Sequence, residues 1–190
     1  MFIINKESFY TYEIKRSKFI THIMPFKCFT KRLEELKLQH PKARHFVTSS
    51  RYLNNLNQII ESFSDDGEPK GTAGKPSLHV LQGHDLINIA SITIRYFGGI
   101  KLGTGGLVRA YSDALNLAID QADLILYQKE ECLSFEVAYE NLRFVEYTLQ
   151  KLDIKNVEKR FDTLVHFKVI ASKELLENLY SSIKDFTTKL

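Results

Sequence analysis

Three carboxylates, Asp65, Asp66 and Glu68, lie within one stretch of four residues. Carboxylate oxygens bind hard cations such as Mg²⁺, and a partly buried carboxylate can act as a general base. The same residue types also form acidic turns, in which Asp side chains accept hydrogen bonds from nearby backbone N–H groups. We favour the acidic turn, with Lys70 or Lys75 as ion-pair partners, and keep the three carboxylates as the catalytic candidates.

A second set of residues suits an anion. Between Arg95 and Gly106 the chain is predicted to leave a strand, pass through a glycine-rich turn and enter a helix. The N-terminus of a helix attracts anions through its free N–H groups and its partial positive charge, and the first turn of this helix contains no Asp or Glu. The alternative is a tight connection whose glycines only permit close packing. The expected anion- or nucleic-acid-binding residues are Lys70, Lys75, Arg95, Gly98, Gly99, Lys101, Gly103, Thr104, Gly105, Gly106 and Arg109.

All nine glycines lie between Gly67 and Gly106. Glycine is used where the backbone takes a positive φ or approaches another group closely, so a functional site is expected in this window. The two familiar phosphate motifs do not fit. Pro76 stands where a P-loop has Ser or Thr, and Val108 stands where the dinucleotide fingerprint has its last glycine. An ordinary ATPase or Rossmann site is therefore not expected.

Neither a metal nor a cofactor is predicted. His79 and His84 are five residues apart, a spacing that fits no zinc signature. Cys28 and Cys132 are 104 positions apart and form no CxxC motif, which indicates a reducing compartment. Both thiols are expected to be buried and inert.

The elements that position these residues form an α+β pattern. In the first part of the chain, strands are expected at 10–15, 18–24, 44–52, 58–64 and 90–96, and helices at 30–40, 76–82 and 105–122. Alternating residues at 90–96 predict a half-buried strand with Arg95 on its polar face. Thr104 is the expected N-cap of the last helix, and Tyr111 is expected in the core.

The second part of the chain has the order β-α-β-β-α. A strand at 133–139 precedes a helix capped by Asn141, a hairpin at 157–161 and 165–170, and a helix capped by Ser172. The apolar face of the last helix is predicted to be Leu175, Leu179, Ile183 and Phe186. This order is most of a ferredoxin-like α/β sandwich, with a short final strand or none after residue 186. A charged break at 127–131 predicts two domains, 1–129 and 130–190.

Composition limits the partners. Of the 190 residues, 44% are hydrophobic and 26% charged, as in ordinary globular proteins. Residues 1–129 hold 17 Lys or Arg against 12 Asp or Glu, a balance that permits a polyanionic partner. No signal peptide is recognised, and no stretch approaches the roughly 18 apolar residues of a membrane span. We therefore expect a cytoplasmic protein with no membrane partner.

The glycines fall into two runs, a first run at 65–76 and a second run at 95–106. These two glycine runs resemble the signature of the YigZ/IMPACT family. The matching stretches are DDGEP at 65–69, GTAG at 71–74, RYFGGIKLGTGGLVRAY at 95–111 and EIKRSKFI at 13–20. The two-part layout is similar as well, so the resemblance spans nearly the whole chain. One departure follows His45, where the family usually has Asn-Cys and this chain has Phe46 and Val47.

The resemblance implies an N-terminal domain similar to ribosomal proteins and to domain IV of elongation factor G. It also implies a C-terminal ferredoxin-like domain similar to domain V of that factor. Eukaryotic members of the family regulate translation by binding a scaffold that activates a stress kinase, and they carry an additional N-terminal domain. The two-domain layout here resembles the bacterial branch.

From the basic glycine-rich turn and the resemblance, we predict a translation-associated regulatory protein that binds RNA or the ribosome. A protein of the translation apparatus is a further expected partner. One alternative is an enzyme that acts on a small phosphorylated substrate, with Asp66 or Glu68 as the base or Mg²⁺ ligand. The other is a protein-binding adaptor. The sequence favours binding over catalysis and points to no particular reaction.

Overall fold

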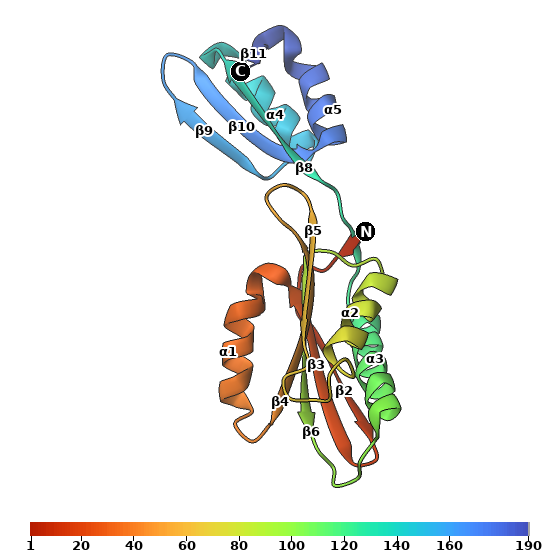
Figure 1. The fold of residues 1–190 in the computed structure, drawn as a ribbon. Helices are drawn as coiled ribbons and strands as arrows, with labels where there is room; N and C mark the ends of the chain where they lie inside the picture. Colours follow the sequence, from red (N-terminus) through yellow and green to blue (C-terminus); the bar gives the residue numbers. More distant parts are fainter. Residues whose placement is uncertain (190) are drawn as a thin grey trace. The chain divides into compact units, whose positions relative to one another are not determined.

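The computed structural model describes residues 1–189 and divides into two compact units, Met1–Tyr127 and Gln128–Leu190 (Figure 1). The described residues form five α-helices and three antiparallel sheets, which is an α+β fold. Within residues 1–189, no helix is long and apolar enough to cross a membrane.

The first unit is built on a five-stranded antiparallel sheet with the strand order β2-β3-β6-β4-β5. Its strands are β2 (Ser8–Ile14), β3 (Ser17–Pro25), β4 (His45–Leu53), β5 (Ile59–Ser64) and β6 (Ile89–Tyr96). The central strand β6 pairs with β3 and β4, so Arg95 lies opposite Phe19 on one side and His45 on the other. A separate two-stranded sheet, β1 (Phe2–Ile3) with β7 (Ile125–Leu126), was not predicted.

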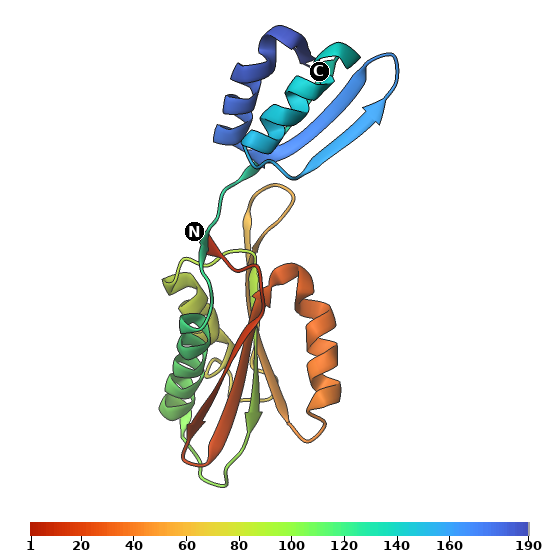
Figure 2. The ribbon, with the colours of Figure 1, turned by 180° about the vertical axis from the view of Figure 1, so that it is seen from behind.

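Helices cover both faces of the five-stranded sheet. Figures 1 and 2 show α1 (Phe29–Gln39) on one face, and α2 (Gly74–Gly83) and α3 (Thr104–Asp120) on the other. On the α1 face, Ile92 and Ile94 pack with Leu36. On the opposite face, the Thr93 hydroxyl hydrogen-bonds to that of Thr21 at 3.0 Å. The sheet is therefore the middle layer of three.

The prediction of β6 as a strand is confirmed, but the prediction that it is half-buried is wrong. Every residue from Ile89 to Arg95 is buried. The alternation of residue types distinguishes two buried faces, one apolar and one carrying hydroxyl groups and Arg95. It does not mark a solvent-facing side, because α2 and α3 cover the polar face.

The predicted helices of the first unit are confirmed, with changes at their ends. The N-cap of α3 is Gly103, with φ +74°, so the prediction of Thr104 as N-cap is wrong. Tyr111 is fully buried, as predicted. Cys28 and Cys132 are both exposed, so the expectation of buried thiols is wrong.

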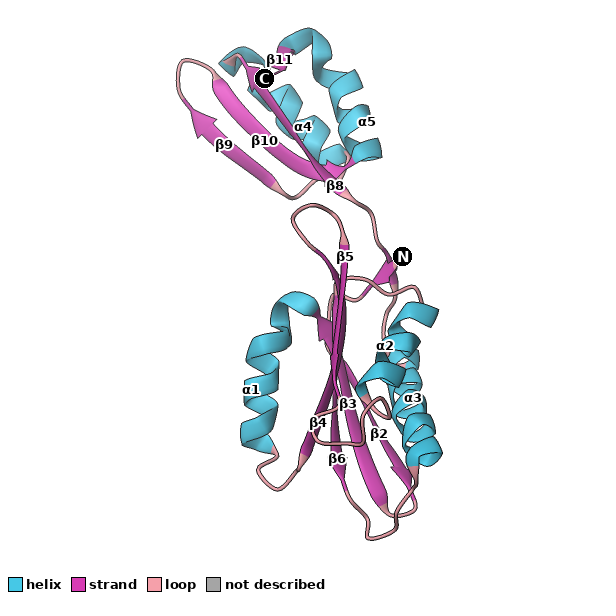
Figure 3. Ribbon diagram, viewed as in Figure 1, coloured by secondary structure: helices cyan, strands magenta, loops and turns pink. Residues whose placement is uncertain are grey.

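The second unit has the element order β-α-β-β-α-β (Figure 3). Its elements are β8 (Glu130–Val137), α4 (Leu142–Lys151), β9 (Val157–Phe161), β10 (Val165–Ser172), α5 (Lys173–Ile183) and β11 (Thr187–Lys189). The sheet order is β11-β8-β10-β9, in which every neighbouring pair is antiparallel. The final strand is thus present but short, and it completes the split-βαβ order.

Helix caps in the second unit were partly predicted. The Ser172 hydroxyl accepts a hydrogen bond from the Leu175 N–H, which confirms the predicted cap of α5. Asn141 occupies the N-cap position of α4, but its side chain makes no cap hydrogen bond. Phe186 follows the end of α5 and is exposed, so its predicted place in the core is wrong. Leu176 packs in the core of this unit.

Candidate functional site

Asp65 shapes the first glycine run. Its two carboxylate oxygens accept hydrogen bonds from the backbone N–H groups of Gly71 at 2.8 Å, Ala73 at 3.1 Å and Gly74 at 2.8 Å. Two of these groups belong to the start of α2, whose N-cap residue is Ala73. A carboxylate at this position satisfies N–H groups that have no partner within the helix. Asp65 therefore closes the loop onto the N-terminus of α2.

Asp66 fixes the same loop to the start of β4. Its backbone φ is +42°. Its Oδ2 atom accepts a hydrogen bond from the Phe46 N–H at 2.6 Å, and its carbonyl oxygen accepts one from His45 Nδ1 at 2.7 Å. The side chain and the backbone of Asp66 thus both hold the loop against one strand end.

Glu68 is buried and lies between the sheet and α3. Its Oε1 atom accepts hydrogen bonds from Arg95 Nη1 at 2.6 Å and from the Tyr111 hydroxyl at 2.9 Å. Burial, and after it the negative charge of Glu68, raises the pKa of Tyr111, which keeps the phenol protonated as a donor. The Arg95 guanidinium also lies over the rings of Phe19 and Phe97, at 5.5 and 5.7 Å.

The three carboxylates therefore have separate partners. Asp65 bonds the start of α2, Asp66 bonds the start of β4, and Glu68 bonds Arg95 and Tyr111. Their main role is to shape the loop. Glu68 forms its ion pair with Arg95 and not with the expected Lys70 or Lys75. Within residues 1–189, no group of three or more His, Cys, Asp or Glu side chains is arranged to hold a metal ion.

The two glycine runs meet through this buried cluster. Glu68 belongs to the first run, Arg95 opens the second run, and Tyr111 lies on the helix that follows it. Glu68 thus forms an ion pair with Arg95, 27 residues further along the chain, and accepts a hydrogen bond from Tyr111, 43 residues further along. Arg95 was expected on a solvent-facing surface, but the structure places it in the interior, with 7% of its surface exposed.

The glycines of the second run serve two different purposes. A Cβ atom on Gly98 would lie 2.0 Å from the carbonyl carbon of Arg16, so Gly98 permits close packing of the β2–β3 turn. Gly99 and Gly103 have positive φ values of +83° and +74°. A Cβ atom on Gly105 would have no neighbour within 4 Å, so nothing in the described structure requires glycine there.

The N-terminus of α3 is exposed and carries no acid. Thr104 and Gly105 are exposed, and the first intrahelical hydrogen bond runs from the Leu107 N–H to the Gly103 carbonyl. No side chain caps this end, and no Asp or Glu lies in the first turn. The N–H groups that precede Leu107 are therefore available to an acceptor outside the chain.

Four of the predicted cations are exposed. Lys70, Lys75, Lys101 and Arg109 all lie on the surface of the first unit. None of these four forms an ion pair with a described residue. The Arg109 Nε atom donates a hydrogen bond to the carbonyl of Gly105 at 3.4 Å, which keeps the side chain along the first turns of α3.

A pocket that the sequence does not predict lies at the end of β6. It has a volume of about 310 Å³ and is lined by Lys42, Arg44, His45, Arg95, Tyr96 and Phe97. A usable signal was present, because three basic residue types occur in the four positions 42–45 just before a strand. The strand pairing that brings them to the end of β6 is not visible in the sequence.

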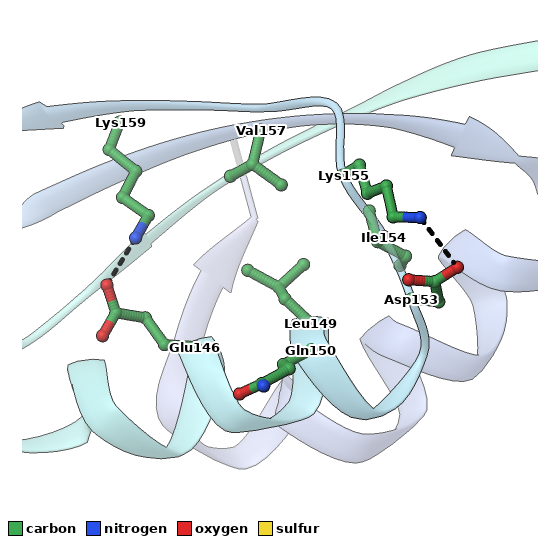
Figure 4. Close-up of a pocket in the computed structure, with 8 residues that line it drawn as sticks. All are labelled: Glu146, Leu149, Gln150, Asp153, Ile154, Lys155, Val157 and Lys159. Atoms are coloured by element: carbon green, nitrogen blue, oxygen red, sulfur yellow. Dashed lines mark hydrogen bonds and ion pairs between the residues drawn. The ribbon is translucent and has the colours of Figure 1, made fainter.

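The second unit has a pocket of about 460 Å³ between α4 and β9 (Figure 4). Leu149, Ile154 and Val157 provide its apolar surface. Its charged side chains pair with each other, Lys159 with Glu146 and Lys155 with Asp153. The charges around this pocket therefore balance within the pocket itself.

Comparison with known proteins identifies the family. The model of the Impact N-terminal domain matches residues 15–119. An IMPACT family member from Haemophilus influenzae is 34% identical over 180 residues, which cover 91% of this chain and 85% of that protein. The IMPACT family member YigZ from Escherichia coli is 34% identical over 182 residues, which cover 92% of this chain and 87% of that protein.

A solved structure agrees with these matches. A crystal structure described as a hypothetical protein is 30% identical in sequence, with a TM-score of 0.72 over 100% of this chain and 95% of that one. The family model alone covers more than half of the chain, and the relatives extend the similarity through both units. On this evidence the chain belongs to the IMPACT family.

Proposed function

We propose that this IMPACT family member is a translation-associated regulatory protein that binds RNA or the ribosome through the glycine-rich entry to α3. The backbone N–H groups before Leu107 would contact a phosphate group. The exposed cations Lys70, Lys75, Lys101 and Arg109 would contact phosphates of the same polyanion. A protein partner in translation is compatible with the same surface.

The observation that carries this proposal is the N-terminus of α3. An acid or a capping side chain is favourable at this end, and α3 has neither. The helices α1 and α4 lack both as well, but α3 differs from them because two glycines follow its first residue. Gly105 adds no side chain that would keep an acceptor away, although its neighbourhood has room for one. A stability argument would favour alanine at this exposed helical position, so a requirement for close backbone approach is the better explanation.

The unpaired surface cations Lys70, Lys75, Lys101 and Arg109 support a polyanion as the ligand. Ion pairs neutralise some cations of this unit, such as Arg51 with Glu61 and Arg32 with Glu35. Lys101 lies three residues before the first residue of α3 and has no such partner among the described residues. Its charge is therefore free to attract phosphate, and that attraction depends on salt.

The carboxylates favour binding over catalysis. The alternative hypothesis, an enzyme that acts on a small phosphorylated substrate, requires Asp66 or Glu68 as a base or a Mg²⁺ ligand. Asp66 Oδ2 bonds a backbone N–H group, and Glu68 Oε1 bonds both Arg95 and Tyr111. Both carboxylates are thus engaged in contacts that hold the unit together.

The proposal is tested by titrating the full chain against a fluorescent single-stranded RNA and against bacterial ribosomes, at salt concentrations from about 50 to 200 mM. We expect binding to at least one of them at low salt, weakening steeply as salt rises, and further weakened by Lys101→Glu. Absence of binding at low salt, or binding that Lys101→Glu leaves unchanged, would overturn the proposal.

A further inference from the structure

The pocket at the end of β6 has the charge and shape of a ligand site. Its volume of about 310 Å³ lies at the lower end of the range for small-molecule pockets. Lys42 and Arg44 come from the connection between α1 and β4, His45 from the start of β4, and Arg95 from the end of β6. Tyr96 and Phe97 complete the lining.

The charges that line this pocket are all of one sign. None of its six lining residues carries a carboxylate. Lys42 and Arg44 are exposed and form no ion pair with a described residue. His45 uses Nδ1 to bond the Asp66 carbonyl oxygen, which holds its ring in place. This contrasts with the pocket of the second unit, where each charged side chain has a partner.

Arg95 adds a buried guanidinium whose donors are only partly used. Its Nη1 atom donates to Glu68, but its Nε atom is buried and has no hydrogen-bond partner among the described residues. Buried donors in folded proteins are nearly always paired, so each exception needs an explanation. Arg95 also lines the pocket, so its guanidinium lies beside any anion that binds there.

The aromatic lining indicates what accompanies the anion. The Tyr96 hydroxyl bonds His40 Nδ1 at 2.9 Å, which fixes that ring. Phe97 is 57% exposed although its ring lies against the Arg95 guanidinium. An exposed ring beside a cluster of cations suits a ligand with a planar group next to a phosphate.

We propose that this pocket binds one nucleotide unit, with its phosphate at Lys42, Arg44 and Arg95 and its base on the Phe97 ring. The inference rests on the proposed function and adds a subsite to it, outside the glycine-rich entry to α3. The nucleotide unit belongs either to an RNA chain or to a free mononucleotide, which present the same chemistry to the pocket.

Three variants test the pocket. Arg44→Ala removes an exposed phosphate contact, and Phe97→Leu removes the ring while keeping an apolar side chain. Lys27→Ala is the matched control, because Lys27 is exposed and follows Pro25, which pairs with Ile89 at the opposite end of β6 from Tyr96. Each variant of the full chain is titrated with adenosine monophosphate, inorganic phosphate and a short single-stranded RNA, with the Phe97 backbone amide followed by NMR.

We expect Arg44→Ala to weaken nucleotide binding about tenfold, in keeping with the loss of a charge-assisted contact. Phe97→Leu should weaken binding of adenosine monophosphate or RNA about tenfold but leave that of inorganic phosphate unchanged. An effect on the RNA titration alone assigns the subsite to an RNA chain, and an effect on the mononucleotide alone assigns it to a free nucleotide. Lys27→Ala should change none of the affinities.

The subsite is refuted if Arg44→Ala changes neither the nucleotide nor the RNA titration, or if Phe97→Leu leaves both unchanged. That failure differs from failure of the proposed function. If Lys101→Glu weakens RNA binding while Arg44→Ala and Phe97→Leu do not, the entry to α3 remains the RNA site and only the pocket is excluded.

Discussion

Glu68 and Arg95 form a buried ion pair, with 2.6 Å between Glu68 Oε1 and Arg95 Nη1. The pair joins the loop that carries the acids to the strand that leads into the second glycine run. Tyr111 adds a hydrogen bond from α3 to the same carboxylate oxygen. The conformation of the glycine-rich surface thus depends on a charge pair inside the unit.

We predict that Glu68→Ala lowers the free energy of unfolding by about 3–5 kcal/mol, because it leaves the Arg95 charge buried without its partner. Glu68→Gln should cost less, since the amide oxygen can still accept from Tyr111. The measurement is urea unfolding followed by circular dichroism. Glu13→Ala removes an exposed acid as the control and should stay within about 0.5 kcal/mol of the parent chain. A Glu68→Ala change as small as that of Glu13→Ala would contradict a stabilising role.

Gly98 and Gly105 should respond in opposite ways to alanine. Gly98→Ala places a methyl group against the Arg16 backbone and should destabilise the chain by about 1–3 kcal/mol or more. Gly105→Ala meets no neighbour and should stabilise α3 by about 0.5–1 kcal/mol. Thermal unfolding of both variants, compared with the parent chain, checks these signs.

Gly105→Ala also separates stability from binding. If a phosphate approaches the backbone at the entry to α3, the added methyl group should weaken RNA or ribosome binding in a protein that is more stable. The same titration on the folded variant decides the matter. Unchanged affinity in Gly105→Ala would mean that this glycine does not serve ligand contact.

The free energy of unfolding should decrease as pH falls through the range in which His22 titrates. Burial lowers the pKa of His22 below its ordinary value of 6.5, although the hydrogen bond to Glu7 opposes the shift. Between 6.5 and the lower folded pKa, the unfolded chain binds more protons, so the free energy of unfolding decreases as pH falls. Above 6.5 both states hold a neutral ring, and this contribution is constant.

His22→Gln removes the titrating ring and should flatten that part of the pH dependence. The exposed His79→Gln is the matched control and should keep the slope of the parent chain. Urea unfolding at pH values on either side of 6.5 measures the slope. An identical slope in His22→Gln would show that another group is responsible.

Local patterns predicted most elements but not what lies against them. The alternation at β6 predicted a strand because every second residue is apolar. It misassigned the polar face, since Ser91, Thr93 and Arg95 are covered by α2, which precedes β6 in the chain, and by α3, which follows it. The partner of Arg95 lies 27 residues away, and no local pattern specifies such a pairing.

The sequence likewise predicts the local structure of the candidate site but not its long-range contacts. The carboxylates were expected to form an acidic turn, and the hydrogen bonds of Asp65 to Gly71, Ala73 and Gly74 confirm that turn. Ion pairs of these acids with Lys70 or Lys75 do not form among the described residues. The pocket of Lys42, Arg44 and Phe97 needed the three-dimensional pairing of β4 with β6.

The salt dependence of RNA binding in Lys101→Ala tests the central claim most directly. For single-stranded RNA, each phosphate contact contributes about 0.7 to the slope of log K against log salt. We predict that Lys101→Ala weakens binding and reduces that slope by about 0.7, whereas Lys27→Ala leaves both unchanged. Parallel lines of equal affinity for Lys101→Ala and the parent chain would contradict a phosphate contact at the entry to α3.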